Sequence, residues 1–218
     1  MFDFLSPHIS GTLPFIYRGL QLTIFITFSG FFFGFIIGAL TGMMRLSNNK
    51  IIYGIATVYI ELVRGTPILV QALFLYFGIS DFVGINFSAV TAGIIAIAIN
   101  AGAYIAEIVR GGVESIDKGQ TEAGRSIGLS SSQTMRYIIW PQAFRRMIPP
   151  LGNQFIISLK DTSIFAIISL NEVTYLIRQY VSTTASPFVP YIMLCLAYLV
   201  ITIPAMVILR RIERKLDV

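Results

Sequence analysis

Five long apolar segments make up most of the chain, and shorter polar stretches separate them. They cover residues 20–44, 51–79, 85–109, 148–170 and 189–209. Each is long enough to cross a hydrocarbon core of about 30 Å as a helix. None has the alternating pattern of barrel strands, and a helix pairs its own backbone groups within lipid. The pattern predicts an all-α membrane protein with about five transmembrane helices, forming a single domain over residues 1–218.

Composition and charge placement agree with this class and predict an orientation. The chain is 55% hydrophobic and only 12% charged, whereas soluble domains are about 25% charged. With five crossings, twelve basic residues share one side of the membrane, and only Arg18 and Arg178 lie clearly on the other. The twelve are Arg45, Lys50, Arg110, Lys118, Arg125, Arg136, Arg145, Arg146, Arg210, Arg211, Arg214 and Lys215. Because cytoplasmic loops are rich in basic residues, we expect an external N-terminus and a cytoplasmic C-terminus in the cell membrane. The net charge of +5 is therefore not taken as a sign of nucleic-acid binding.

Three smaller sequence features do not point to a chemical function. No signal-peptide pattern precedes the first apolar segment, which we expect to remain in the protein. In that segment Gly30, Gly34, Gly38 and Gly42 repeat every four residues and predict a groove for a closely packed helix. The single cysteine, Cys195, lies in an apolar run and is expected to be a small buried hydrophobe. No disulfide or metal site is expected within the chain.

The longest hydrophilic stretch, about 110–150, is too long for a simple connection between helices. Residues 120–127 are predicted to form a short helix, with Gly128 in the positive-φ position that follows a helix end. The run Ser130-Ser131-Ser132-Gln133 has the spacing of a capping box and predicts the start of a second helix. We therefore expect a helix, a tight turn and a second helix on the cytoplasmic side.

This loop resembles a known family. Glu122-Ala123-Gly124, then Gly128, then Ile138-Ile139-Trp140-Pro141 matches the spacing of the loop motif of permeases in ATP-binding-cassette importers. In that motif Glu-Ala-Ala precedes Gly and then Ile-x-Leu-Pro. Gly124 and Trp140 are the two departures, and glycine loosens a helix by about 1 kcal/mol relative to alanine. A solvated loop stabilised only by its caps is the alternative interpretation.

The remaining motifs resemble the polar amino acid branch of this family, the histidine and glutamine permease type. They are ELVRGTP at 61–67, NAGAYIAE at 100–107, PPLGNQ at 149–154 and KDTS at 160–163. The resemblance implies a type I importer permease fold and a dimer with an identical or a related permease. It also implies a cytoplasmic ATPase that carries ATP and Mg, and an external binding protein that delivers the amino acid. The ATPase-coupling residues that it implies are Glu122, Ala123, Gly124, Gly128 and Leu129. The chain has no phosphate-binding Gly-Lys-Ser or Gly-Lys-Thr sequence, so we expect neither an ATPase site nor a cofactor in it.

Four charged residues fall in the interior of apolar segments, away from their ends: Glu61, Arg64, Lys160 and Asp161. Each costs about 2.5 to 3.5 kcal/mol at the centre of a membrane helix and therefore needs a partner or water. Glu61 and Arg64 are three residues apart, which predicts an ion pair on one helix face. Helix breaks are predicted beside both charged pairs. Gly65, Thr66 and Pro67 form one, with Thr66 as N-cap, and Asp161, Thr162 and Ser163 are cap residues at the other.

Interrupted helices direct their positive N-termini into the bundle, as in transporters that bind a carboxylate near the membrane midplane. We expect Arg64 and the backbone near Thr66 or Thr162 to meet the substrate carboxylate, and Glu61 or Asp161 to meet its amino group. Neutral hydrogen bonds are expected from Asn100, Tyr104 and Gln154. The full set of candidate substrate-binding residues is Glu61, Arg64, Thr66, Asn100, Tyr104, Gln154, Lys160 and Asp161. These charges could instead pair only with one another and stabilise packing or the dimer.

The charge balance leaves arginine, histidine, lysine and glutamine open as substrates, because two acids and two bases lie in the interior of the apolar segments. Three other classes compete with the importer subunit: a channel or secondary transporter, an intramembrane enzyme and a membrane scaffold. The first has no use for an ATPase-docking loop, and the second lacks any catalytic motif in this sequence. Glu107 and Arg110 are expected to form an ordinary pair at a solvated helix end.

Overall fold

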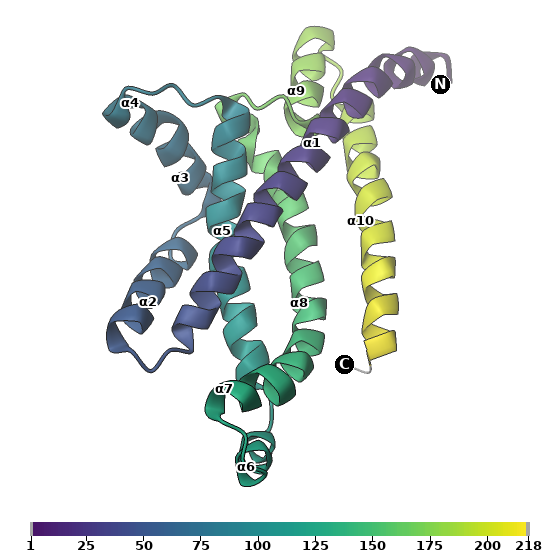
Figure 1. Cartoon of the computed structure of the whole chain (residues 1–218). Coiled ribbons are helices and arrows are strands. Elements are labelled where there is room, and N and C mark those ends of the chain that lie inside the picture. Colours follow the sequence, from purple (N-terminus) through teal and green to yellow (C-terminus); the bar gives the residue numbers. More distant parts are fainter. Residues whose placement is uncertain (1, 217–218) are drawn as a thin grey trace.

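The computed structural model describes residues 2–216, so residues 1, 217 and 218 of the predicted domain lie outside the described part. Side chains are described from His8 onward. The described chain is helical with short connections and contains no strand (Figure 1). The helices are α1 (Phe2–Arg45), α2 (Lys50–Arg64), α3 (Ile68–Leu73), the π-helical turn η1 (Phe74–Ile79), α4 (Ser80–Val83), α5 (Ala89–Glu114), α6 (Lys118–Ser126), α7 (Ser131–Thr134), the π-helical turn η2 (Met135–Ile139), α8 (Trp140–Asp161), the 3₁₀ helix η3 (Thr162–Ile168), α9 (Val173–Thr184) and α10 (Phe188–Leu216).

Three helices in the described chain are long and apolar enough to cross a membrane. They cover His8–Arg45, Ala89–Glu114 and Phe188–Leu216, and the bent pair Lys50–Arg64 and Ile68–Val83 makes up to a fourth. The predicted segment 148–170 does not join them, because it is divided between α8 and η3, and α8 carries four charged residues. Even so, α8 runs beside α5 along the bundle, and α1 begins at the end opposite to that where α10 finishes (Figure 1).

The glycine stripe of α1 packs against α5, as its spacing predicts. A Cβ atom on Gly34 would lie 3.0 Å from the carbonyl oxygen of Ala98, and one on Gly38 would lie 2.6 Å from that of Gly102. The two backbones therefore approach so closely that larger side chains have no room. This contact holds α5 against α1 and so positions the residues of α5 that form the candidate site.

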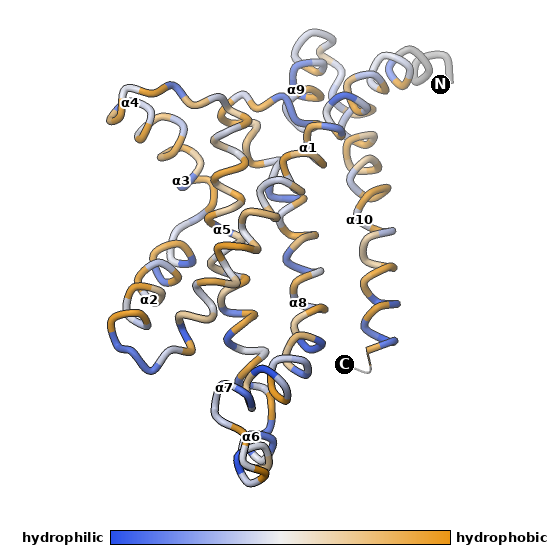
Figure 2. Tube along the Cα trace, in the orientation of Figure 1, coloured by the Kyte–Doolittle hydropathy of each residue, from blue (hydrophilic) through white to orange (hydrophobic). Residues whose placement is uncertain are grey.

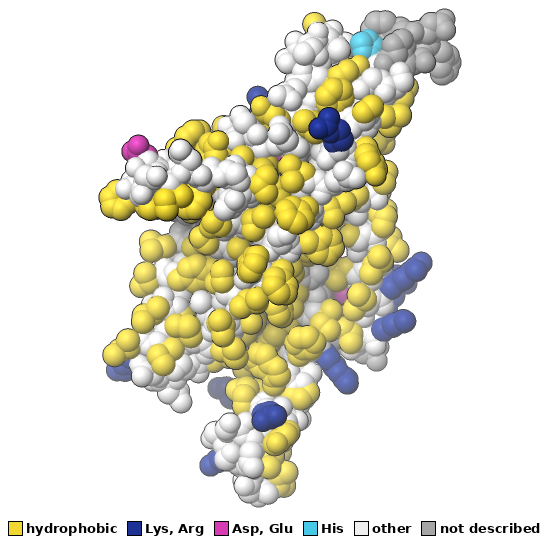
Figure 3. Space-filling view, turned by 45° about the horizontal axis from the view of Figure 1, so that its top comes forward, with side chains coloured by type: hydrophobic (Ala, Val, Ile, Leu, Met, Phe, Trp, Pro, Cys, Tyr) yellow, Lys and Arg dark blue, Asp and Glu magenta, His cyan; other side chains and the backbone are white. Residues whose placement is uncertain are grey.

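Hydrophobic residues dominate the middle of the long helices, and polar residues lie toward their ends (Figure 2). On the face shown in Figure 3, hydrophobic side chains spread over the middle, and most Lys and Arg side chains lie in the lower half. The exposed apolar side chains include Phe25, Phe28, Val200 and Ile208, as expected of helices that face lipid. Cys195 is also exposed on α10, so the prediction that it is buried is wrong. An apolar residue of a membrane helix can face lipid as readily as the protein core.

Candidate translocation cavity and coupling loop

The chain bends by 100° between α2, which ends at Arg64, and α3, which begins at Ile68. The predicted break at residues 65–67 is therefore confirmed, but Thr66 does not cap the second helix. Its hydroxyl donates a hydrogen bond backward to the carbonyl oxygen of Leu62, at 2.9 Å. Pro67 takes the N-cap position without a side-chain hydrogen bond. Thr66 thus closes the end of α2, where carbonyl groups lack partners.

Gln71, on the first turns of α3, stabilises the bend. Its side-chain amide donates hydrogen bonds to the carbonyl oxygens of Val63, at 2.8 Å, and Thr66, at 3.0 Å. In return its side-chain oxygen accepts a hydrogen bond of 3.1 Å from Asn100 on α5. Gln71 is not among the site residues predicted from the sequence. A polar side chain shortly after a helix-breaking Gly-Thr-Pro, in an otherwise apolar run, was the available signal.

A cavity of about 500 Å³ lies at the inner side of this bend. Its lining residues come from the bend, from α5 and from α8: Arg64, Gly65, Thr66, Pro67, Ile68, Asn100, Tyr104, Gln154, Ile157 and Asp161. Six of the eight predicted substrate-binding residues are among them. The other two, Glu61 and Lys160, have exposed side chains and do not line it. The cavity wall thus carries one basic and one acidic side chain, Arg64 and Asp161, together with neutral hydrogen-bonding groups.

The second predicted break, at residues 161–163, differs from the first. The chain does not begin a newly capped helix there, because α8 continues at Asp161 into the tighter turns of η3. Asp161 makes no capping hydrogen bond, while the hydroxyls of Thr162 and Ser163 bond backward to Leu159 and Lys160, each at 2.7 Å. The predicted N-terminus directed into the bundle is therefore wrong at this position. Backward hydrogen bonds keep the chain helical where caps would have ended it.

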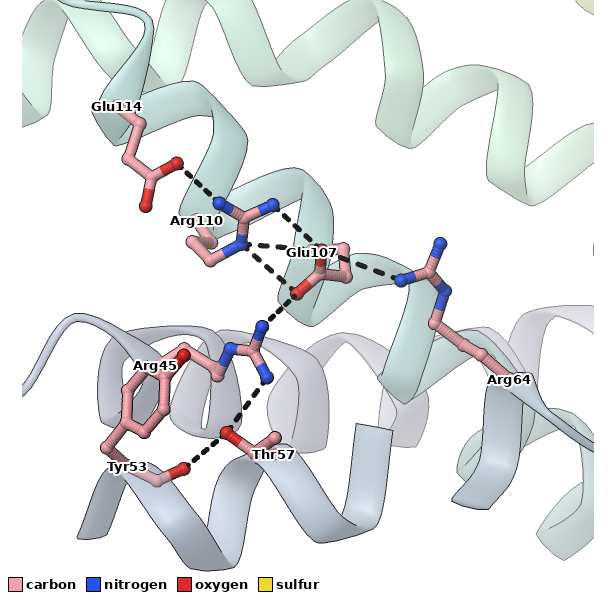
Figure 4. A network of polar contacts seen from close by, with 7 residues as sticks. All are labelled: Arg45, Tyr53, Thr57, Arg64, Glu107, Arg110 and Glu114. Carbon is pink, nitrogen blue, oxygen red and sulfur yellow. Dashed lines mark hydrogen bonds and ion pairs between the residues drawn. The ribbon is translucent and has the colours of Figure 1, made fainter. Parts of the chain in front are cut away.

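A cluster of ionic side chains lies beside the cavity and centres on Glu107 of α5 (Figure 4). Its carboxylate is 2.9 Å from Arg110, 3.5 Å from Arg64 and 3.7 Å from Arg45. Arg110 also pairs with Glu114. The expected pair of Glu107 and Arg110 is confirmed, but it belongs to a larger cluster, and the Glu107 side chain is only 18% exposed. We refer to these five residues as the Glu107 cluster.

Arg64 and Arg45 enter the cluster from different helices. Within the described residues Arg64 pairs with Glu107 and not with Glu61, so the predicted pair within one helix is wrong. The Arg64 guanidinium also lies over the Tyr104 ring, 5.4 Å from its centre. Arg45, at the end of α1, donates a hydrogen bond of 2.9 Å to Thr57 of α2. The sequence predicted only the Glu107–Arg110 pair of this cluster, because Arg45 and Arg64 are brought to it by the packing of α1 and α2 against α5.

The predicted helix, turn and second helix after α5 are present. The short helix α6 begins after Asp117, whose side chain caps the amide of Gly119 at 2.7 Å, so it starts two residues before the prediction. At its other end Gly128 has a φ of +88°. The amides of Gly128 and Leu129 bond to the carbonyl oxygens of Arg125 and Gly124, each at 3.1 Å. This pair of bonds is the Schellman arrangement of a helix end.

The second helix starts with the predicted capping box, in which Ser130 and Gln133 cap each other's backbone amides. On α6, Gly124 is buried, and a Cβ atom there would lie 2.8 Å from the Ile138 side chain. The departure from alanine therefore lets α6 approach η2 closely. Glu122, Ala123 and Ile127 are exposed, and Ile127 is 76% exposed.

A comparison with protein families identifies this architecture. Residues 30–218 match the family described as "Binding-protein-dependent transport system inner membrane component". The chain belongs to this family. It is therefore a membrane-spanning permease subunit of a binding-protein-dependent ABC importer, in which a separate subunit hydrolyses ATP. The resemblance found in the sequence is confirmed.

Individual relatives and solved structures agree with the family. The glutamine transport system permease protein GlnP of Escherichia coli (strain K12) is 42% identical over 207 residues, covering 94% of each chain. The arginine transport system permease protein ArtQ of Bacillus subtilis (strain 168) is 32% identical over 94% of this chain and 93% of its own.

A crystal structure of an amino acid ABC transporter with histidines matches with a TM-score of 0.91 and 39% identity, over 95% of this chain and 97% of its own. An inward-facing structure of the MetNI methionine ABC transporter matches with a TM-score of 0.73 over 91% of this chain and 96% of its own. At 20% identity, the second match supports the fold alone.

Proposed function

We propose that this permease subunit carries an amino acid with a neutral polar side chain, such as glutamine, through the cavity at the bend. The observation that carries the proposal is the presence of one basic and one acidic side chain, Arg64 and Asp161, in the cavity wall. A free amino acid has one carboxylate and one ammonium group, so one basic and one acidic side chain balance it. The relative named for glutamine transport supports the same class.

In this proposal Arg64 binds the substrate carboxylate, because a guanidinium can donate two parallel hydrogen bonds to it. Asp161 accepts hydrogen bonds from the ammonium group. Asn100, Tyr104 and Gln154 are neutral, so they suit an uncharged amide side chain. An additional charge on an arginine or lysine substrate would find no further acidic group in the cavity wall. Glu61 and Lys160 have exposed side chains outside it and are not part of the proposed binding site.

Three protein partners complete the proposed importer. A cytoplasmic ATPase, which carries ATP and Mg, docks on α6 through Glu122, Ala123 and Ile127. An external binding protein delivers the amino acid at the opposite end. A second permease, identical or related, covers the exposed apolar face of α2 and η1, where Ile55 is 60%, Leu62 is 65% and Phe74 is 61% exposed. Gly124, Gly128 and Leu129 hold α6 in its docking orientation.

The proposed orientation places α6 in the cytoplasm and the start of α1 outside, because the basic residues collect at the end with α6. Ser131→Cys in a Cys195→Ser background tests this by labelling with a membrane-impermeant thiol reagent. We expect labelling in broken cells or inverted vesicles only. Ready labelling of intact cells would contradict the orientation.

The substrate is tested by uptake of radiolabelled amino acids into proteoliposomes that hold the permease with its ATPase and binding protein. We expect glutamine to be taken up and to be displaced poorly by arginine or lysine. Arg64→Met and Asp161→Asn should each lower uptake by about tenfold or more, since each removes a charge-assisted hydrogen bond. Lys160→Met is the matched control, because Lys160 is adjacent in sequence but exposed. If both cavity variants assemble and transport like the wild type, the proposed cavity is wrong.

A further inference from the structure

Arg64 belongs both to the cavity and to the Glu107 cluster. It lines the cavity, yet its guanidinium is bound to Glu107, a residue that does not line it. The stacking of the guanidinium on Tyr104, itself in the cavity wall, keeps it at this boundary. The Arg64 side chain therefore joins the bend to the Glu107 cluster on α5.

The rest of the cluster leads to the base of the coupling loop. Glu107 accepts hydrogen bonds from Nε and Nη2 of Arg110, at distances from 2.9 to 3.3 Å. Arg110 also bonds to Glu114, which is the last residue of α5. Asp117, the N-cap of α6, follows three residues later. The chain of contacts thus runs from the cavity wall to the end of α5, and a short connection joins that end to the helix that is proposed to dock the ATPase.

Of the three arginines around Glu107, Arg64 has the greatest freedom to leave it. Its contact is a single pair of atoms at 3.5 Å and its side chain is 39% exposed, whereas Arg110 makes three hydrogen bonds. Arg45 is 3.7 Å away, but its side chain is only 12% exposed and is also bound to Thr57. Charge favours the same departure. With Arg64 the cluster has three arginines and two glutamates, and without Arg64 its charges balance. A partly exposed ion pair of this kind is weak, so Glu107 binds Arg64 only weakly.

We propose, on the basis of the proposed function, that Glu107 is a positioning residue that competes with the substrate carboxylate for Arg64. In the empty cavity Glu107 holds Arg64 at the wall. A bound amino acid takes Arg64 over with two hydrogen bonds, and Glu107 keeps only Arg45 and Arg110. Cavity occupancy thereby changes the charge balance at the base of the coupling loop, where the ATPase can respond to it.

The first test is equilibrium binding of radiolabelled L-glutamine to the purified permease–ATPase complex without the external binding protein. Glu107→Gln removes the competitor, so the Kd should fall by roughly two- to fivefold, the factor that a partly exposed ion pair is worth. Glu114→Gln is the matched control, because Glu114 binds the same Arg110 but does not contact Arg64. L-Glutaminamide, which lacks the carboxylate, should bind weakly and with the same Kd to wild type and to Glu107→Gln.

The second test measures ATP hydrolysis by the same complexes with and without saturating L-glutamine. The wild type and Glu114→Gln should respond to glutamine, whereas Glu107→Gln should hydrolyse at one rate in both conditions. Because Glu107→Gln leaves three arginines with one carboxylate, it could fail to fold. Glu107→Asp therefore repeats both tests. Aspartate keeps the negative charge beside Arg110, but its shorter side chain draws the carboxylate back from Arg64. The Kd for L-glutamine should therefore fall by less than in Glu107→Gln.

Two results would overturn the proposal that Glu107 competes with the substrate for Arg64. One is an equal Kd for Glu107→Gln and Glu114→Gln, and the other is a Kd change that persists when Arg64→Met is already present. Failure of the proposed function itself has a different signature. In that case Arg64→Met binds L-glutamine as tightly as the wild type, whatever residue stands at position 107.

Discussion

Two sharp changes of direction in this chain are built in different ways. The bend between α2 and α3 lies beside α5, within the length of the bundle (Figure 1), and the side chain of Gln71 satisfies the carbonyl oxygens that the bend exposes. The turn between α6 and α7 lies beyond the bundle (Figure 1), and backbone bonds around Gly128 close it without help from another helix. One turn depends on a distant partner, Asn100, and the other is local.

The difference follows from the surroundings of each turn. At the depth of the apolar segments, a carbonyl released at a bend needs a partner from the protein or from water in a cavity, because lipid offers none. At the aqueous end a glycine with positive φ and a serine cap are sufficient, because water can satisfy the remaining groups. The transition from α8 to η3 supports this view. There, backward hydrogen bonds from Thr162 and Ser163 avoid releasing the carbonyls of Leu159 and Lys160.

The largest expected effect is that of Gln71→Leu. It removes the bonds that Gln71 donates to the carbonyl oxygens of Val63 and Thr66, and it removes the acceptor of Asn100. Val63 keeps only longer bonds of 3.4 Å from Thr66. The free energy of unfolding should fall by about 2 kcal/mol or more. Thermal unfolding of the purified complex should occur about 4–8 °C lower, and uptake should be lost. Val70→Ala, next in sequence and 50% exposed, should cost far less. A Gln71→Leu protein with wild-type stability and uptake would remove the contrast between the two turns.

Gly128→Val should have the next largest effect on stability. A Cβ atom at Gly128 meets nothing within 4 Å, so the cost comes from the positive φ alone and should be about 1–2 kcal/mol. The variant should remain in the membrane but lose ATP-driven uptake, because α6 changes its orientation. Gly111→Val is the control, since that position is equally open but helical. Uptake and ATP hydrolysis are measured for both variants in proteoliposomes. Wild-type values for Gly128→Val would contradict the role of this turn in coupling to the ATPase.

Ser130→Ala should cost about 1 kcal/mol, the usual value for a lost N-cap. The effect should remain local, because the Ser130 side chain bonds only to the backbone amide of Gln133 within the capping box. Hydrogen exchange of the peptide that covers α7 and η2 should become faster, while the peptide that covers α3 keeps its rate. Faster exchange at α3 would show that the loop turn is not independent of the bundle.

Thr66→Val should have the smallest effect, about 0.5 kcal/mol. Thr66 bonds backward to Leu62 and does not cap α3, and Gln71 still satisfies the Thr66 carbonyl. The sequence analysis, which made Thr66 an N-cap, predicts a loss as large as that of Ser130→Ala. Comparing the unfolding midpoints of the two variants decides between these expectations.

The sequence by itself determined the features that depend on neighbouring residues. The all-α membrane class, the break at residues 65–67, the positive φ of Gly128 and the capping box at Ser130 all follow from local pattern and backbone sterics. The family motif in the loop has the same origin, because its residues lie close together in the chain. Six of the eight residues predicted to bind substrate line the cavity. They could be predicted because polar residues are rare in apolar segments and need a polar environment there.

Only the tertiary structure decided which partners these residues have. Arg64 binds Glu107 and not the nearby Glu61, and Gln71 supports a bend whose other contact is Asn100 on α5. Both choices arise where the glycine stripe of α1 and the bend of α2 bring separate helices against α5. Spacing within one helix predicts which side chains can meet, but a charge in a low-dielectric bundle pairs with whichever opposite charge packing brings nearest. Such distances between helices are not encoded in any local pattern.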